Sequence, residues 1–401
     1  MRSKTWSGTR TVAVTVAVTM LILAAGTGIA TWAFYGHLNR NLDTSGDIQH
    51  LLDGADDNDD GPRRPLNILI LGTDGRDCKG CSIDGESGAG GSDSTILLHV
   101  AADRKSAYGV SIPRDAIVDR PECTTEDGKK IDEAKDVMWN QAYALGGPIC
   151  TARQTELLTG VPFDHYIALD FAGFRGMVDA VGGVTVCIPE AIDDKEHNIF
   201  LPAGTHNLRG KQALDYVRNR SSTPNADLGR MRRQQYFLTT LSTKVLSADT
   251  LTRPRRLAKF AAELSKSIST DIGSVSGLAE LAAQMREIKP TGVEFVTVPN
   301  AGFPTGDPNW GRLRILPESD QLWQRMLDDR PLHDPRDPAP SSASPTTPAN
   351  PGSASAAPGP TGSGSSAGPG SEAAPSDVPA DAMSPEEKDK DAADNGLCAP
   401  A

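Results

Sequence analysis

Residues 12–35 run without a charged side chain, and this stretch constrains the architecture of the chain more than any other. An α-helix that crosses the hydrocarbon core of a bilayer needs about 20 predominantly apolar residues, so the stretch is long enough to span a membrane once. Three basic residues precede it, and Trp32 and Tyr35 lie where aromatic side chains meet a membrane interface. The positive-inside rule predicts a cytoplasmic N-terminus over residues 1–11 and an extracytoplasmic chain after Tyr35.

A cleaved secretory signal peptide is the alternative, since the small residues from Ala24 to Gly26 resemble a cleavage site. The apolar core of a signal peptide spans about 7–15 residues, and the stretch here is longer. We therefore expect an uncleaved, single-pass transmembrane helix over residues 12–35.

The segments that flank the central part of the chain are polar. Residues 36–65 are expected to be an acidic linker, a solvated spacer that holds the next domain off the membrane. Residues 331–401, rich in Pro, Ser, Ala, Gly and acidic side chains, are expected to be a disordered tail. Residues 43–64 and this tail carry the whole formal net charge of −12. Acidity and extracytoplasmic placement argue against nucleic-acid binding.

The remaining residues, 66–330, are predicted to form one α/β domain. Short apolar runs that are typical of buried strands recur along this region, and helical patterns lie between them. The expected strands are 66–71, 95–100, 108–112, 166–169, 184–188 and 293–298. The expected helices are 134–144, 152–158, 171–181, 228–248, 253–268 and 277–288. This alternation predicts a central mixed sheet covered by helices on both faces.

A segment near the middle of the domain carries five arginines between Arg218 and Arg233. Arginine presents a rigid fork of donors that matches phosphate oxygens two at a time, so the segment predicts a phosphate or pyrophosphate site. Asp227 is a plausible N-cap for a helix that follows. On that helix one face is shared by Arg230, Arg233 and Gln234, while Arg232 points elsewhere. A solvated basic helix face would give the same pattern.

Charged residues also adjoin the first three expected strands. Asp74 follows the first strand, Asp93 precedes the second, and Arg114 follows the third. Ligands of α/β sheets collect where strands end. Asp74 and Asp93 together suit a divalent cation, because Mg²⁺ is commonly held by one or two carboxylates plus substrate phosphates, although each is also an ordinary turn residue. Carboxylates for a metal and arginines for phosphates are what phosphoryl transfer requires.

Six cysteines on the outer side of a membrane favour disulfides. Cys123 and Cys150 both lie at loop edges and are expected to pair. Cys78 and Cys81 would close a short loop or bind a metal, although a single CxxC is a weak zinc signal. The remaining two are expected to be unpaired, Cys187 as a buried strand thiol and Cys398 as a free thiol in the tail.

The order of these motifs resembles the LytR-CpsA-Psr family of cell-wall glycopolymer ligases. The similarity covers nearly all of 66–240. The matching pieces are 67–76, 92–94, 110–115, 140–147, 164–166, 178–184, 210–220 and 227–235. The resemblance implies a membrane-anchored extracytoplasmic enzyme that takes a glycopolymer, such as teichoic acid, from a polyprenyl-pyrophosphate carrier and joins it to peptidoglycan by a phosphodiester.

The resemblance also assigns roles to individual residues. Asp74 and Asp93 would hold Mg²⁺ or Mn²⁺. The pyrophosphate contacts would be Arg114, Arg218, Arg220, Arg230 and Gln234, with Arg76 and Arg233 at motif positions of less defined role. The family usually carries an arginine immediately before its Ser-Asp pair, whereas Gly91 stands there in this chain. One expected phosphate contact is therefore missing, and Arg76 is a candidate substitute.

The mechanism that follows has a peptidoglycan hydroxyl attack the sugar-side phosphorus, with Arg114, Arg218, Arg220 and Asp93 as the catalytic set. Asp93 and Asp115 both remain candidates for the base that removes the hydroxyl proton. A lipid-binding groove could be lined by residues 171–181, although ordinary core packing explains these apolar residues as well. A polyprenyl-pyrophosphate hydrolase and a non-catalytic lipid-binding regulator of envelope assembly remain alternatives. His165, within a strand-like run, is expected to be structural.

Overall fold

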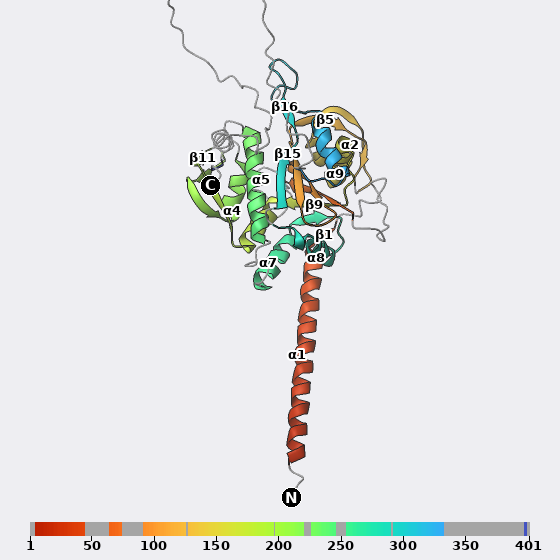
Figure 1. The fold of residues 1–401 in the computed structure, drawn as a ribbon, viewed down its shortest axis with the longest axis vertical. Helices are drawn as coiled ribbons and strands as arrows, with labels where there is room; N and C mark the ends of the chain where they lie inside the picture. The colour runs from red at the N-terminus through yellow and green to blue at the C-terminus, as the bar shows by residue number, and fades with distance from the viewer. Residues whose placement is uncertain are drawn as a thin grey trace, which may run out of the picture.

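The computed structural model of the chain consists of a long N-terminal helix that projects from an α/β domain (Figure 1). The structure describes residues 5–44, 64–73, 91–125, 127–195, 197–219, 226–245, 254–289, 292–332 and 397–398.

Helix α1 spans Thr5–Asn41, and its segment Val12–Asn41 is long and apolar enough to cross a membrane. None of the most apolar window is buried inside the protein, which suits a lipid-facing helix. The helix runs six residues beyond the expected end at Tyr35. It leads directly into strand β1, Asp43–Thr44, which pairs in parallel with β14, Ile268–Thr270.

The expected linker over 36–65 is therefore wrong at its N-terminal end. Leu38 and Leu42 are buried against Ile268 and Val275, so this part of the chain belongs to the folded domain. Local pattern did not reveal this packing, because two leucines at i, i+4 in a polar stretch are too few to establish a buried helix face. The rest of the expected linker, 45–63, and nearly all of the expected tail lie outside the described residues.

The predicted α/β fold with a central mixed sheet is confirmed. Seven strands pair in the order β1-β14-β9-β2-β3-β4-β15. The strands not yet defined are β2 (Leu66–Thr73), β3 (Ser92–Val100), β4 (Ala107–Ile112), β9 (His165–Asp170) and β15 (Val293–Thr297). Strand β2 is parallel to β9 and antiparallel to β3, while β4 is antiparallel to β3 and parallel to β15. The C-terminal ends of β2, β4, β9 and β15 and the N-terminal end of β3 thus lie at one end of the sheet.

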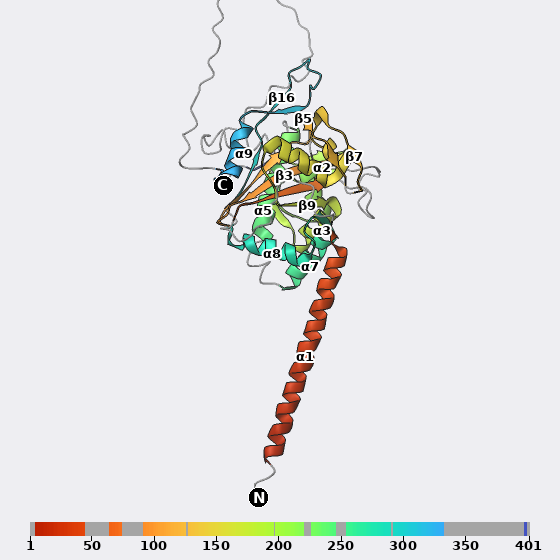
Figure 2. The same ribbon diagram turned by 90° about the vertical axis from the view of Figure 1, so that its right-hand side faces the viewer.

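Helices cover both faces of this sheet, because alternate strand residues are apolar in both directions. Leu69 and Leu71 of β2 pack with Ile149 of α2 (Gln141–Thr159) and Trp323 of α9 (Ser319–Leu327). On the other face, Ile68 packs with residues of α8 (Val275–Gln284) and the 3₁₀ turn η2 (Met285–Glu287). Figure 2 shows α2 and α9 on the opposite side of the strands from α8 and α7 (Pro254–Ser265).

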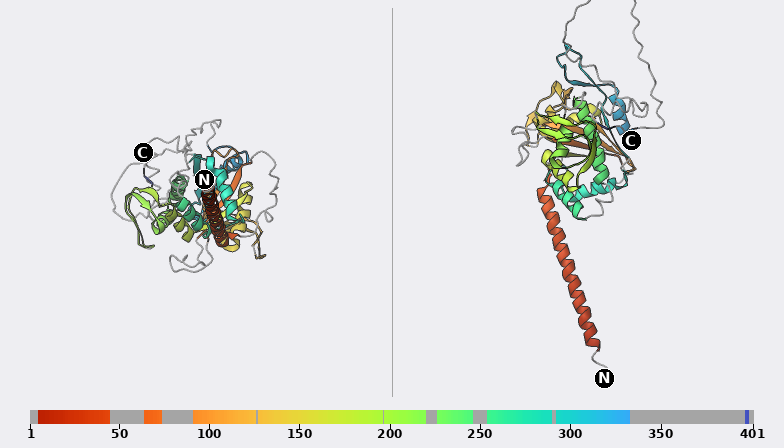
Figure 3. Two further views of the ribbon diagram at one scale, coloured as in Figure 1. Left: turned by 90° about the horizontal axis from the view of Figure 1, so that it is seen from below. Right: turned by 90° about the vertical axis from the view of Figure 1, so that its left-hand side faces the viewer.

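A second core lies beside the sheet. It is built from α3 (Phe171–Ala180), α4 (Gly210–Arg218), α5 (Ala226–Val245) and two hairpins, β10–β13 (Val184–Ile188 with Gly204–Leu208) and β11–β12 (Ile192–Asp194 with Ile199–Leu201). The hairpins extend to one side of the domain (Figures 1 and 3). Strand 184–188, expected in the central sheet, belongs here instead. Asp227, expected as an N-cap, lies inside α5, which begins at Ala226.

Two further small sheets complete the fold. One has the order β16-β17-β5-β8, formed by Asn300–Gly302, Leu313–Ile315, Ala116–Arg120 and Ala134–Met138. The helix expected over 134–144 is therefore wrong: its first half pairs as β8 with β5, and α2 begins only at Gln141. Strands β6 (Cys123–Thr124) and β7 (Lys130–Ile131) form the other sheet.

Two disulfides among the described residues stabilise loops of the domain. Cys123 of β6 is bonded to Cys150 of α2, in agreement with the expected pairing. Cys187 is bonded to Cys398, so the expectation of two unpaired thiols is wrong. Side chains of a strand alternate between faces, and in β10 the buried positions are Val184, Val186 and Ile188. Cys187 consequently lies on the outer face, where the C-terminal segment can reach it. Cys78 and Cys81 lie outside the described residues.

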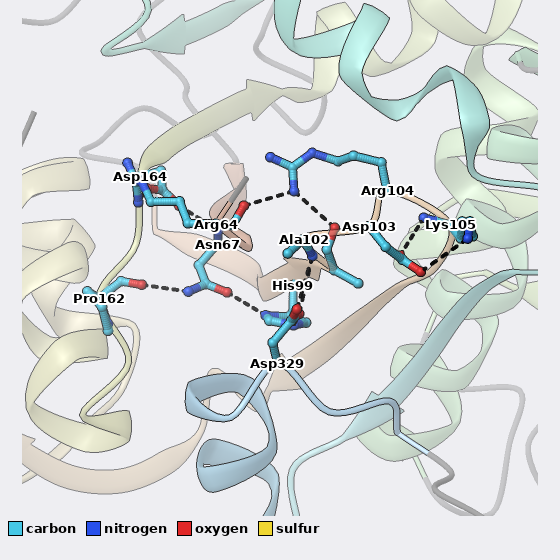
Figure 4. Close-up of polar contacts among 11 residues, drawn as sticks. Arg64, Asn67, His99, Ala102, Asp103, Arg104, Lys105, Pro162, Asp164 and Asp329 are labelled. Atoms are coloured by element: carbon cyan, nitrogen blue, oxygen red, sulfur yellow. Dashed lines mark hydrogen bonds and ion pairs between the residues drawn. The ribbon is translucent and has the colours of Figure 1, made fainter. Parts of the chain in front are cut away.

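A polar network closes the end of the sheet where β3 ends (Figure 4). His99 is buried, and its ring nitrogens lie 2.8 Å from Asn67 Oδ1 and 3.1 Å from Asp329 Oδ1. Asp329 also accepts from the backbone N–H of Ala102, which ties the segment after α9 to the sheet. Asp164 accepts from the backbone N–H of Asn67 at 2.7 Å. Burial lowers the pKa of His99, and its hydrogen bond to Asp329 opposes this.

Candidate functional site

The predicted site residues that the structure describes gather at the other end of the sheet, where β2, β4, β9 and β15 finish. The described members are Asp93, Arg114, Arg218, Arg230, Arg233 and Gln234, while Asp74, Arg76 and Arg220 lie outside the described residues.

Asp93 and Arg114 meet because β3 and β4 are antiparallel neighbours. Thr95 pairs with Ile112, so the start of β3 lies beside the residues that follow β4. Arg114 Nη1 is 2.5 Å from Asp93 Oδ1, and both side chains remain about one-fifth exposed. A charge-assisted bond of this kind fixes both groups while leaving them open to solvent, as a binding site requires.

A second carboxylate extends this arrangement. Arg114 Nε lies 3.5 Å from Asp115 Oδ2, and Arg312 Nη1 lies 3.3 Å from Asp115 Oδ1. Asp115 and Asp93 therefore both have Arg114 as a partner, and this geometry does not select one of them as the base. Arg312 was missed from the sequence, because it reaches the site from the loop before β17 and no motif marks it.

Arg218 approaches the same end of the sheet from α4. Its guanidinium lies 4.7 Å from the centroid of the Phe171 ring, and Phe171 is the first residue of α3, directly after β9. Stacking on an aromatic face orients a guanidinium and leaves its donors in the ring-parallel plane, where phosphate oxygens can bind.

The sheet topology gives the width of the site. Strands β9 and β4, whose ends carry Phe171 and Arg114, are separated by β2 and β3. Three strand spacings place those ends about 14 Å apart. Asp93, at the start of β3, lies between the two arginine positions.

Arg230 and Arg233 are buried in the protein rather than solvated. Only 2% and 1% of their surfaces are exposed, so the alternative of a solvated basic helix face is wrong for them. Arg233 Nη2 donates to the backbone carbonyl of Asn219, the residue between Arg218 and Arg220. Burial lowers the pKa of Arg233, although arginine stays protonated at neutral pH. In this geometry Arg233 positions the arginine segment, while Arg232 is partly exposed.

Two glutamines hold α5 in place. Gln234 Nε2 donates to the carbonyl of Val217 at 3.0 Å, which links α5 to the last turn of α4. Gln235 Nε2 donates to Ser111 Oγ and Thr297 Oγ1, both at 3.0 Å, at the ends of β4 and β15. The sequence pattern missed Gln235, because a buried glutamine on a helix has no signature without the hydroxyls that face it.

The remaining predictions for this region have mixed outcomes. Apolar residues of 171–181, considered as a lipid groove, pack with Phe237 and Leu241 in the second core. His165 lies at the far end of β9 and binds Asp271 through Nδ1 at 2.8 Å, which fits the expected structural role. Burial alone would lower the pKa of His165, but the hydrogen bond and charge of Asp271 outweigh it and raise the pKa.

The divalent cation expected at Asp74 and Asp93 stays a prediction. Among the described residues no group of three or more histidine, cysteine, aspartate or glutamate side chains is arranged to hold a metal ion. Mg²⁺ needs fewer protein ligands when substrate phosphates supply the rest. Asp93, partly exposed at a strand end beside Arg114, is compatible with that mode of binding.

Gly91 has room for a larger side chain. A Cβ atom built on Gly91 would come no closer than 3.9 Å to any atom beyond its neighbours, the contact being with Asn140 Nδ2. Its backbone does not adopt a positive φ angle. Steric exclusion therefore does not explain why glycine stands at this position.

Known proteins resemble this chain in sequence and in fold. The profile of the LytR_cpsA_psr family matches residues 39–312. Cell wall biosynthesis protein LcpA of Corynebacterium glutamicum is 30% identical over 319 residues, which is 72% of this chain and 59% of LcpA. The polyisoprenyl-teichoic acid–peptidoglycan teichoic acid transferase TagV of Bacillus subtilis is 31% identical over 222 residues, or 54% of this chain and 52% of TagV. The chain thus spans only about half to three-fifths of the length of these relatives.

Solved structures agree with the fold. The crystal structure of B. subtilis TagV superposes with a TM-score of 0.51 and 25% identity, over 67% of this chain and 99% of that structure. Protein gbs0355 from Streptococcus agalactiae gives a TM-score of 0.53 at 23% identity, over 66% of this chain and 88% of that one.

Proposed function

The chain belongs to the LytR-CpsA-Psr family, and on that premise we propose that it is a membrane-anchored transferase which moves a glycopolymer from a polyprenyl-pyrophosphate carrier to peptidoglycan. The observation that carries the proposal is the grouping of Asp93, Arg114 and Arg218 at one end of the central sheet, partly open to solvent. The name of TagV, a teichoic acid transferase, supports the same reaction class, and the name of LcpA, a cell wall biosynthesis protein, supports a role in cell-wall assembly.

In the proposed reaction, a hydroxyl oxygen of peptidoglycan attacks the phosphorus on the sugar side of the pyrophosphate. A new P–O bond forms, and the bond from this phosphorus to the bridging oxygen breaks. Polyprenyl phosphate leaves with the bridging oxygen, and the glycopolymer becomes joined to peptidoglycan by a phosphodiester. The hydroxyl proton passes to Asp93 or Asp115. No outside oxidant or reductant is needed.

The protein contributes mainly charge and position. Arg114 and Arg218 neutralise the phosphate oxygens from opposite sides of the site, and such preorganised donors lower the barrier as charge moves to the leaving group. Arg233 and Gln235 hold the segments that carry the arginines. Mg²⁺, held by Asp93 and Asp74, would add further neutralisation of the pyrophosphate.

The proposal places the N-terminus of α1 in the cytoplasm and the domain outside, as the positive residues before the helix predict. Carrier lipid and peptidoglycan would then meet on the domain's side of the membrane.

Transfer of a short glycan from a polyprenyl-pyrophosphate donor to peptidoglycan tests the proposal, with full-length protein in vesicles. Asp93→Ala and Arg218→Ala are each expected to abolish transfer, whereas Lys105→Ala, an exposed lysine between β3 and β4 at the far end of the sheet, serves as the control. Transfer that is unchanged in both site variants would overturn the site assignment. Release of free glycan without linkage to peptidoglycan would support the hydrolase instead, and tight donor binding without turnover would support the non-catalytic binder.

A further inference from the structure

The junction between α1 and the domain is packed on both sides of the end of the helix. Leu38 is 1% exposed and Leu42 8% exposed, both within a core shared with α7, β14 and α8. Asn39 Oδ1 accepts the backbone N–H of Val275, the first residue of α8, at 3.0 Å. The next residues pair with β14 as the edge strand of the central sheet. The helix and the domain are therefore one packed unit through this point.

The length of α1 fixes the level at which this packing occurs. Val12–Asn41 comprises 30 residues, which at about 1.5 Å per residue is about 45 Å, the thickness of a bilayer including its headgroups. Leu38 and Asn39 are within one helical turn of the end of that segment. Their contacts consequently lie at the level of the lipid headgroups, and α7 and α8, which make those contacts, must lie there too. Figures 1 and 2 show both helices at the end of the domain from which α1 emerges.

The charge of this region suits lipid phosphates. On α7, Lys259 is exposed, whereas the acidic residue Glu263 is only partly exposed. Arg40 at the end of α1 and Lys266 after α7 are also exposed, and Lys266 Nζ lies 3.5 Å from Glu263 Oε1. Interfacial helices typically place lysine and arginine against anionic headgroups. Helix α8 has no basic residue, and its one acidic residue, Glu280, is exposed.

We propose that α7, together with the end of α1, forms a surface that rests on the phospholipid headgroups and holds the domain in one fixed orientation on the membrane. This inference depends on α1 being the anchor and does not depend on the transfer reaction. It also bears on where that reaction takes place. Helix α3 packs against α7, and the ring of Phe171 at the start of α3 lies under the guanidinium of Arg218. Only one helix layer would separate the membrane surface from the arginine side of the site.

Photo-cross-linking to phospholipid tests the proposal in the full chain. A photoreactive amino acid replaces Lys259 in protein reconstituted into nanodiscs of phosphatidylglycerol and phosphatidylcholine. The matched control carries the same group at Lys130, an exposed lysine on β7, which lies farther along the molecule from α1 than α7 does (Figure 2). We expect severalfold more lipid adduct from position 259 than from position 130. Equal adduct from the two positions would overturn the proposal.

A second variant tests the role of the junction. A Gly-Ser-Gly-Ser insertion between Asn41 and Leu42 separates the helix from the domain, and it is expected to reduce the adduct at position 259 to the level at 130. Persistence of the full adduct would show that the junction does not set the orientation. An intact Cys123–Cys150 disulfide verifies that the inserted protein folds, and the comparison of positions 259 and 130 in the uninserted chain stands without it. No glycan donor is used, so failure of the transfer assay and failure of this test are separate results.

Discussion

The two ends of the central sheet are both polar, but their side chains find partners in different ways. At the end with His99, most of the polar groups are buried, although Asp329 keeps 31% of its side chain exposed, and they are bound by backbone and side chains from β2, β3 and the segment after α9. At the end with Asp93 and Arg114, the groups are partly exposed. Arg312, from the loop before β17, binds Asp115, and Arg218 of α4 lies over the Phe171 ring at the end of β9. Buried polar groups with protein partners stabilise a fold, whereas exposed and convergent charges are available to a ligand. The comparison distinguishes charge that is satisfied within the fold from charge that is open to a ligand.

The largest effect should come from exchanging one arginine at each end for alanine. Arg114→Ala is expected to lower transfer by about 100- to 1,000-fold, the usual cost of removing one preorganised donor from a transition state. Arg104→Ala, at the other end, removes bonds to the carbonyls of Arg64 and Ala101 and should lower the melting temperature while transfer per folded molecule is retained. Transfer assays and thermal unfolding of both variants measure this contrast. The comparison fails if Arg104→Ala is the variant that loses transfer in a stably folded protein.

Substitution of Asp329 tests what the polar network around His99 contributes to stability. Asp329→Ala removes the acceptor for His99 and for the Ala102 N–H and should cost about 1–3 kcal/mol of unfolding free energy. Its φ angle is +50°, a conformation that asparagine tolerates, so Asp329→Asn is the control and should cost less. Urea unfolding in detergent gives both values. A loss of transfer without a loss of stability would mean that this end is not merely structural.

The pair of His165 and Asp271 predicts a pH dependence of stability at the same end. The pKa of His165 is raised in the folded state. The stabilisation that this ion pair adds to the free energy of unfolding is therefore complete below the pKa of unfolded histidine, about 6.5, and is lost as the pH rises through the pKa of His165 in the folded protein. Asp271→Asn should remove this dependence and cost about 1–2 kcal/mol at low pH. Unfolding free energies measured on either side of about pH 6.5 decide it. A wild-type protein that gains stability as pH rises through this window would contradict the assignment.

The smallest expected effect concerns Gly91, at the end of the sheet that holds Asp93 and Arg114. Gly91→Arg should raise transfer or tighten donor binding by about threefold to tenfold, because it adds one partly exposed charge-assisted contact. Gly91→Ala is the control, since a methyl group meets nothing closer than 3.9 Å and should change little. Donor titrations of both variants provide the measurement. If arginine and alanine behave alike, the missing arginine is not a deficit of this site.

Much of the fold followed from local pattern. Strands β2, β3, β4, β9 and β15 and helices α3, α5, α7 and α8 lie close to their expected positions, because apolar period and run length are local properties of the chain. Residues 134–144 were assigned wrongly, because a strand pairing with β5 overrides weak helical character. Short strands such as β1 and β14 have too few residues to show a pattern.

The sequence by itself determined the apolar helix, the alternation of strands and helices, the arginine segment and the Cys123–Cys150 pair. Each depends on residue type and spacing along the chain. Only the tertiary structure decided that Leu38 and Leu42 dock the anchor to the domain, that Cys187 finds Cys398, that Gln235 binds the ends of β4 and β15, and that Arg230 and Arg233 are buried. These depend on which distant segments become neighbours, and the free energy of such contacts comes from partners that no local window of the sequence contains.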